Sequence, residues 1–128
     1  MEFQVWTADK QDTVTAVLSR AAEQFSERVF LDFQGDKYTY GEVDKKSTQL
    51  ARGLLERGVK EGDRVGSILD SNLDAVLLWF AVNKIGGISV PINTAYKGEF
   101  LRHQFASAGC RLMVAEDHYA GRVLEVSS

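Results

Sequence analysis

The 128-residue sequence contains one cysteine, one proline and two histidines, and each scarcity excludes a class of structure. Because Cys110 is the only cysteine, neither an internal disulfide nor a cysteine-based metal cluster can form. His103 and His118 would have to recruit distant carboxylates to bind zinc, so we expect no metal site. With 45% hydrophobic residues and a single proline, the chain is neither disordered nor of low complexity.

The sequence also lacks an excess of one charge and any long hydrophobic run. Fifteen Lys and Arg and eighteen Asp and Glu are interspersed and give a net charge of −3, which argues against a nucleic-acid partner. The most apolar stretch, residues 73–82, is interrupted by Asp74 and is too short to cross a bilayer. Residues 1–10 mix polar side chains among apolar ones, unlike a signal peptide. We therefore expect a cytoplasmic protein without a transmembrane segment.

Hydrophobic spacing in the first half predicts two helices separated by a short β-hairpin. Residues 29–33 and 37–40 are typical of strands, with a tight turn expected at Gly35-Asp36. Thr39 with Glu42 three residues later has the form of a capping box, which predicts a helix start. The helices expected from apolar residues at i, i+3, i+4 and i+7 are 13–27 and 40–58.

The second half alternates apolar strands with helices. The expected strands are 64–69, 88–92 and 111–115, and the expected helices are 71–85 and 98–108. Ser71 is the expected N-cap of the first of these helices, with Asp74 at its third position, and Gly86-Gly87 is its expected C-terminal stop. The segment from Asp117 is either a short helix or a frayed end.

Strands that are apolar on both faces belong to a parallel sheet covered by helices. The predicted fold class is therefore α/β: a partial doubly wound, mostly parallel sheet flanked by helices, with a short N-terminal β-hairpin. Two right-handed βαβ units would lie side by side between residues 64 and 115. We expect an N-terminal extension, residues 1–12, followed by one α/β unit, residues 13–128.

Motifs for common chemistries are missing from the sequence. It contains no phosphate-binding G-x-x-x-x-G-K-[ST], no G-x-G-x-x-G and no G-x-S-x-G nucleophile elbow. Carboxylates such as Asp70 and Glu61 lie near strand or helix ends, where capping and solvation explain them better than general-base catalysis. Phe80 is predicted to be core, whereas Trp79 points elsewhere, either to peripheral packing or to a partner. We assign no catalytic residue.

Several blocks of sequence, in order, carry a resemblance to a known family. They are YTYGEV at residues 38–43, ARGL at 51–54, GVKEGDRVG at 58–66, KIGG at 84–87 and VPINTAY at 90–96. Over residues 13–122 the chain resembles the N-terminal part of AMP-forming acyl-CoA synthetases. That family uses ATP, Mg²⁺ and coenzyme A to convert a carboxylic acid to an acyl-CoA, with AMP and pyrophosphate as products. The family's catalytic signature motifs have no counterpart in these 128 residues, so the resemblance implies an inactive scaffold that binds no cofactor by itself.

The resemblance also implies one marginal ligand contact. In some relatives the loop matching residues 93–96 lies near the coenzyme A nucleotide, which makes Asn93 a candidate. Several relatives carry arginine where this chain has Ala95, and Lys97 is a candidate replacement for that cation. Arg122 lies in a segment that some relatives also place near coenzyme A. The sequence of residues 93–101 resembles the corresponding segment of fatty-acyl and crotonobetaine/carnitine-type ligases.

Two hypotheses about partners follow. In the first, the chain is part of a longer synthetase that acts on small-molecule acids, located in the cytoplasm or at the periphery of a membrane. In the second, it acts alone as a self-associating or coenzyme A-binding module without catalysis, because a partial doubly wound sheet exposes apolar surface. A homo-oligomer or the remainder of the same chain would cover that surface.

Overall fold

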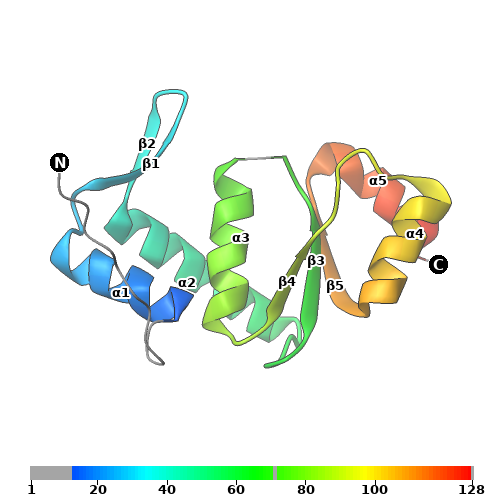
Figure 1. Cartoon of the computed structure of the whole chain (residues 1–128), viewed down its shortest axis with the longest axis horizontal. Coiled ribbons are helices and arrows are strands. Elements are labelled where there is room, and N and C mark those ends of the chain that lie inside the picture. Colours follow the sequence, from blue (N-terminus) through cyan, green and yellow to red (C-terminus); the bar gives the residue numbers. More distant parts are fainter. Residues whose placement is uncertain (1–12, 71, 128) are drawn as a thin grey trace, which may run out of the picture.

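The computed structural model describes residues 13–70 and 72–127, so the expected extension, residues 1–12, lies outside the described residues. The elements, in chain order, are α1 (Val14–Gln24), β1 (Val29–Phe33), β2 (Asp36–Thr39), α2 (Tyr40–Glu56), β3 (Arg64–Ile68), α3 (Leu73–Lys84), β4 (Ile88–Pro91), α4 (Gly98–Ala108), β5 (Cys110–Ala115) and α5 (Asp117–Val126). The α/β class is confirmed, and the segment from Asp117 is a helix (Figure 1).

The first three elements after α1 confirm the hairpin and the second helix with one correction. Thr39 Oγ1 accepts a hydrogen bond from Glu42 N at 3.1 Å, which is the capping interaction expected for α2. The turn, however, is Gln34-Gly35 rather than Gly35-Asp36, because Asp36 already pairs with Phe33. Both turn residues have positive φ, 55° and 98°, as the two-residue turns that match strand twist require.

The three strands that follow the hairpin form a parallel sheet of order β4-β3-β5. The connection through α3 places β4 on one side of β3, and the connection through α4 returns the chain to the other side. The strand order therefore reverses at β3, which makes the sheet doubly wound. The two βαβ units are not simply successive along the sheet, since β5 pairs with β3 and not with β4.

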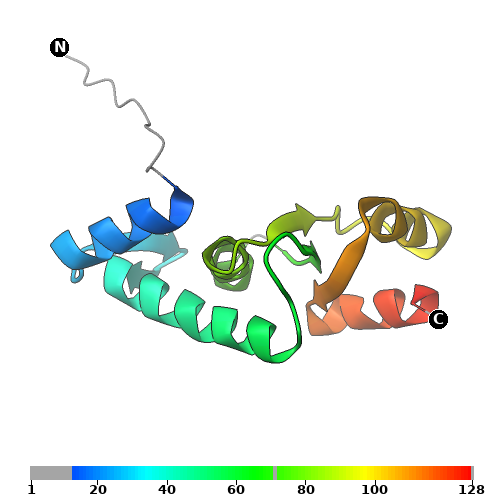
Figure 2. The same cartoon turned by 90° about the horizontal axis from the view of Figure 1, so that it is seen from below.

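Alternate residues of β5 face two different cores. Leu112 and Val114 pack against the cluster built from α2, α3 and Val65, whereas Met113 and Ala115 pack against the cluster around Leu101 of α4 and Val126 of α5. Figure 2 shows α4 and α5 on the opposite side of the sheet from α3. A third cluster joins α1, the hairpin, α2 and α3 through Leu18, Val43, Leu77 and Phe80, so Phe80 is core as expected.

The ends of α3 explain both its position and one wrong prediction. Asn72, not Ser71, is the N-cap: its Oδ1 accepts a hydrogen bond from Ala75 N at 3.2 Å, which places Asp74 at the second helical position. Ser71 lies outside the described residues. At the other end, Gly86 has φ +73° and Gly87 N donates to Val82 O at 2.9 Å. This is a Schellman stop, as the glycine pair predicted.

Cys110 begins β5, one residue earlier than expected, and is partly buried. Its sulfur lies beside Gly66 of β3, where an added Cβ would approach Sγ to 2.9 Å. Burial raises the pKa of the Cys110 thiol, and the Arg64 guanidinium partly offsets that shift. Within residues 13–70 and 72–127, no helix has the length and hydrophobicity needed to span a membrane.

Candidate functional site

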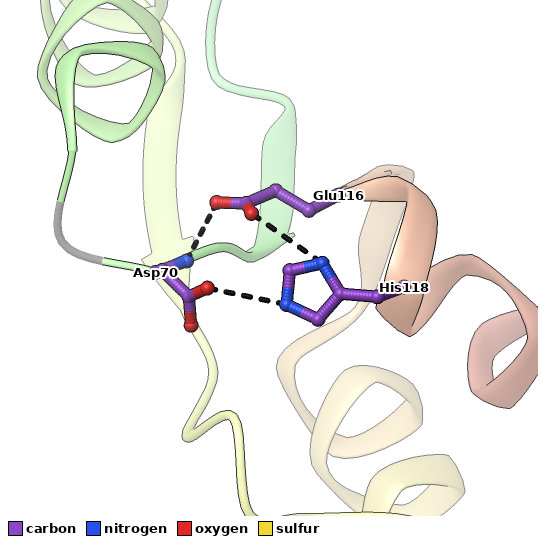
Figure 3. A group of neighbouring side chains, drawn as sticks. All are labelled: Asp70, Glu116 and His118. Carbon is purple, nitrogen blue, oxygen red and sulfur yellow. Dashed lines mark hydrogen bonds and ion pairs between the residues drawn. The ribbon is translucent and has the colours of Figure 1, made fainter.

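Polar side chains meet where β3 and β5 end. Asp70 follows β3 by two residues, and Glu116 follows β5 directly. Because β3 and β5 run parallel, their carboxyl ends lie at the same edge of the sheet, the edge at which open α/β sheets bind ligands. Figure 3 shows that the first turn of α5 adds His118, whose imidazole lies between the two carboxylates. We refer to Asp70, Glu116 and His118 as the edge triad.

Each member of the edge triad has a partner within the triad. His118 Nε2 lies 3.1 Å from Asp70 Oδ2, and His118 Nδ1 lies 3.6 Å from Glu116 Oε2. Glu116 Oε1 also accepts hydrogen bonds from Asp70 N and from Asn72 Nδ2, both at 2.8 Å. Glu116 therefore fixes the loop between β3 and α3 and at the same time faces the imidazole.

A second set of contacts links the edge triad to the loop before α4. Tyr119 OH donates to Asp70 Oδ1 at 2.6 Å, and the Arg122 guanidinium carbon lies 5.1 Å from the Tyr119 ring centre. Arg122 NH1 donates to Thr94 O at 2.7 Å. The hydrogen bond to Asp70, with a smaller contribution from burial, raises the pKa of Tyr119, while Thr94 and Arg122 oppose the shift.

The three residues predicted near coenzyme A have different environments. Arg122 is partly buried, and its hydrogen bond to Thr94 O brings α5 to the loop that contains Asn93. Asn93 is exposed, and its Oδ1 accepts a hydrogen bond from Ala95 N at 2.9 Å. Lys97 is the exposed N-cap residue of α4 and makes no side-chain cap hydrogen bond. The structure thus joins Arg122 to the predicted loop, and coenzyme A binding stays a prediction.

A hollow of about 480 Å³ lies between α3 and two members of the edge triad, Glu116 and His118. Its apolar walls come from Leu50, Leu69, Leu78 and Val114, and its polar rim from Asp74, Glu116, Asp117 and His118. A rim of carboxylates with one imidazole can bind a cation or exchange a proton. It does not suit a phosphate, because like charges would repel it.

Sequence reasoning missed most of this site. Asp70 was expected to be a capping or solvated residue; it is exposed, and its carboxylate also accepts from Tyr119 and pairs with His118. Glu116 and Tyr119 were not singled out as site residues, and His118 was considered only as a zinc ligand and set aside. One signal was available, since Glu116 and Asp70 each follow a strand of a predicted parallel sheet, and such residues gather at one edge.

Trp79 is the most prominent apolar residue on the surface of α3. Its side chain is 46% exposed, and its ring lies 5.1 Å from that of buried Phe80. It borders an apolar hollow of about 420 Å³ whose other walls include Val14, Val17 and Tyr40. Trp79 therefore points away from the main core, as expected, while a partner for it stays a prediction.

Comparison with known proteins identifies the family. The model of the family described as "AMP-binding enzyme" matches residues 18–127. Tyrocidine synthase 2 of Brevibacillus parabrevis is 35% identical over 111 residues, which are 87% of this chain and 3% of that protein. Acyl-CoA ligase SID4 of Ajellomyces capsulatus is 34% identical over 87 residues, 68% of this chain and 15% of the ligase.

A solved structure agrees with these relatives. The complex of VinN with 3-methylaspartate superimposes with a TM-score of 0.85 and 26% identity, over 90% of this chain and 32% of VinN. The chain thus spans a small part of each of these proteins. Since the match to the family model covers most of the sequence, the chain belongs to the family of AMP-binding, adenylate-forming enzymes.

Proposed function

We propose that the chain is the N-terminal scaffold of an ATP-dependent acyl-CoA synthetase. The parent enzyme would convert a carboxylic or fatty acid, ATP and coenzyme A to acyl-CoA, AMP and pyrophosphate. The observation that carries this proposal is the 34% identity to an acyl-CoA ligase over two thirds of the chain, combined with the family description that matches residues 18–127. Residues 13–128 would form its N-terminal α/β subdomain, with residues 1–12 as an extension.

The described residues suit a supporting role better than adenylation itself. Transfer of an adenylyl group requires positive charge and backbone donors gathered around a triphosphate and its Mg²⁺. The hollow at the sheet edge has three carboxylates on its rim instead. The residues of this site therefore do not fit ATP, and we expect the groups that bind ATP and Mg²⁺ to come from other parts of the parent enzyme.

For coenzyme A the fit is partial. The Arg122 guanidinium is already engaged with Thr94 O and the Tyr119 ring, so its role would be to hold the loop of residues 93–97 in place. Asn93 Oδ1 is likewise used within the loop, by Ala95 N. Exposed Lys97 would then supply the cation for a nucleotide phosphate, and Asn93 would lie beside it.

A second candidate function is an adenylation unit of a peptide synthetase. The observation in its favour is the 35% identity to tyrocidine synthase 2 over 87% of the chain. The two candidates differ in the group that accepts the activated acid: a synthetase of the first kind requires coenzyme A. A third candidate, a self-associating module, is favoured by the exposure of Phe100 and Leu124, at 75% and 71%.

The test uses two proteins: the 128-residue chain, and the longest protein encoded by the reading frame that contains it. Each is incubated with ATP, Mg²⁺, coenzyme A and separate panels of fatty acids and amino acids, and pyrophosphate release is measured. We expect no release from the short chain, and release with fatty acids from the long protein. Release with amino acids alone would favour the second candidate, and a multimer of the short chain in light scattering would favour the third.

The coenzyme A contact is tested by Lys97→Gln in the long protein. We expect a higher KM for coenzyme A and an unchanged rate of acid-dependent pyrophosphate exchange, because exchange does not need the thiol. Arg102→Gln is the matched control, since Arg102 lies on the same helix and pairs with Glu99 at 3.2 Å. An unchanged KM for coenzyme A in Lys97→Gln would remove Lys97 from the proposed contact.

A further inference from the structure

We propose that Asp70, Glu116 and His118 form a binding site for a divalent transition-metal ion such as Zn²⁺. The proposal does not depend on the function proposed above. It starts from the convergence of one nitrogen and two oxygen donors from two parts of the chain: Asp70 follows β3, while Glu116 and His118 lie 46 and 48 positions further on. One donor atom from each residue lies within 4.8 Å of the other two.

The distance between the His118 and Asp70 donor atoms is close to that of a zinc ligand pair. Zinc lies about 2.0–2.2 Å from imidazole nitrogen and carboxylate oxygen, so two ligand atoms at a tetrahedral angle are about 3.3 Å apart. His118 Nε2 and Asp70 Oδ2 are 3.1 Å apart. Glu116 Oε2 faces the other ring nitrogen, Nδ1, at 3.6 Å. Binding of all three residues to one ion therefore requires the His118 ring to turn, and its side chain is 56% exposed.

The kinds of donor select the kind of metal. Mg²⁺ and Ca²⁺ prefer oxygen ligands alone, whereas an imidazole nitrogen with two carboxylates suits Zn²⁺ and Co²⁺. Three protein ligands leave a fourth position for water. The hollow beside the triad has space for that water, and Asn72 Nδ2 and Asp70 N already fix the orientation of the Glu116 carboxylate.

The local charge favours a cation independently of the triad itself. Asp74 of α3 and Asp117 of α5 line the same hollow as Glu116 and His118, and no lysine or arginine is among the described residues that line it. Three carboxylates therefore give the hollow a negative charge. A bound dication would neutralise it and would link α5 to the loop after β3.

The experiment is metal titration of the whole chain. Calorimetry with ZnCl₂ measures stoichiometry, and the visible absorption of added Co²⁺ reports a nitrogen-containing site. We expect saturable one-to-one binding and a rise in the melting temperature with Zn²⁺. His118→Gln and Asp70→Asn should each abolish both effects, with circular dichroism used to confirm that the variants remain folded.

Two variants control for zinc binding by the other histidine and by the cysteine. His103→Gln, at an exposed position of α4, and Cys110→Ser should bind Zn²⁺ as the unchanged chain does. The proposal is overturned if the folded chain shows no binding heat and no Co²⁺ spectrum. It is also overturned if His118→Gln binds as well as the unchanged chain, or if His103→Gln or Cys110→Ser loses binding.

Discussion

The Lys84 ammonium at the end of α3 lies 2.6 Å from Asp44 Oδ1 of α2, and only 11% of the Lys84 side chain is exposed. The same nitrogen donates to Asp44 O at 2.9 Å and to Thr48 Oγ1 at 2.7 Å. An ammonium has three donors, and here all three have acceptors. This contact joins the two helices that cover one face of the sheet, and it compensates for the cost of removing the charge from water.

Replacing this lysine should destabilise the protein. Lys84→Met removes the ammonium from Asp44 Oδ1 and Thr48 Oγ1, and we expect the free energy of unfolding to fall by about 1–3 kcal/mol. The expected loss of stability is smaller than for a fully buried pair because 32% of the Asp44 side chain reaches solvent. Urea denaturation measures the loss. Lys46→Met, at an exposed position of α2, should change stability by less than about 0.5 kcal/mol, and equal losses in the two variants would contradict the assignment.

The core between the sheet and α4 and α5 depends on Leu101. This side chain is 0% exposed and packs with Ile68, Ile92 and Val126. Leu101→Ala should therefore lower the free energy of unfolding by about 2–5 kcal/mol. The adjacent Phe100 is 75% exposed, so Phe100→Ala serves as a control with a much smaller effect. A larger loss in Phe100→Ala would mean that α4 faces the sheet differently.

Gly86 is required by its backbone conformation. At φ +73° an alanine is strained, and its Cβ would also approach Glu61 Cγ to 2.9 Å. We expect Gly86→Ala to cost about 1–2 kcal/mol in thermal or urea unfolding. Gly121→Ala makes the opposite prediction, because Gly121 lies within α5 with open space at its Cβ. That variant should gain roughly 0.5–1 kcal/mol.

Cys110 makes stability fall at alkaline pH. Burial raises the pKa of the Cys110 thiol in the folded protein. As the pH increases, the thiol therefore ionises at a lower pH in the unfolded chain than in the folded one. The contribution of the neutral thiol is complete below the ordinary thiol pKa of about 8.5 and is lost as the pH rises through the folded value. Cys110→Ala should remove this loss. The measurement is the difference in unfolding free energy between the two proteins across alkaline pH; a difference that does not vary with pH would contradict the shift.

Local pattern predicted the helices and strands well because their signals are local. The Thr39 cap, the Gly86 stop and the end of α4 at Gly109, which has positive φ, follow from neighbouring residues alone. Ser71 and Asn72 are both good N-caps, and only the loop after β3, held by Glu116, selects Asn72. The order of the strands depends on the path of α4 around β3, which hydrophobic spacing does not encode.

The candidate site was harder to predict than the fold because its residues are far apart in sequence. His118 was dismissed as a metal ligand for lack of neighbouring donors, yet folding places Asp70 3.1 Å from it. Likewise, the sequence pattern did not predict the contact of Lys84 with Asp44, forty positions earlier. Arg122 was singled out from the family resemblance, and its hydrogen bond to Thr94 O joins it to the loop that contains Asn93.

The most direct test of the proposed function is identification of the product of the longest protein that contains these residues. With ATP, Mg²⁺, coenzyme A and a mixture of fatty acids and amino acids, mass spectrometry identifies any thioester or adenylate formed. We predict a fatty acyl-CoA, with AMP in equal amount. Aminoacyl-adenylates without any coenzyme A thioester would contradict the proposal.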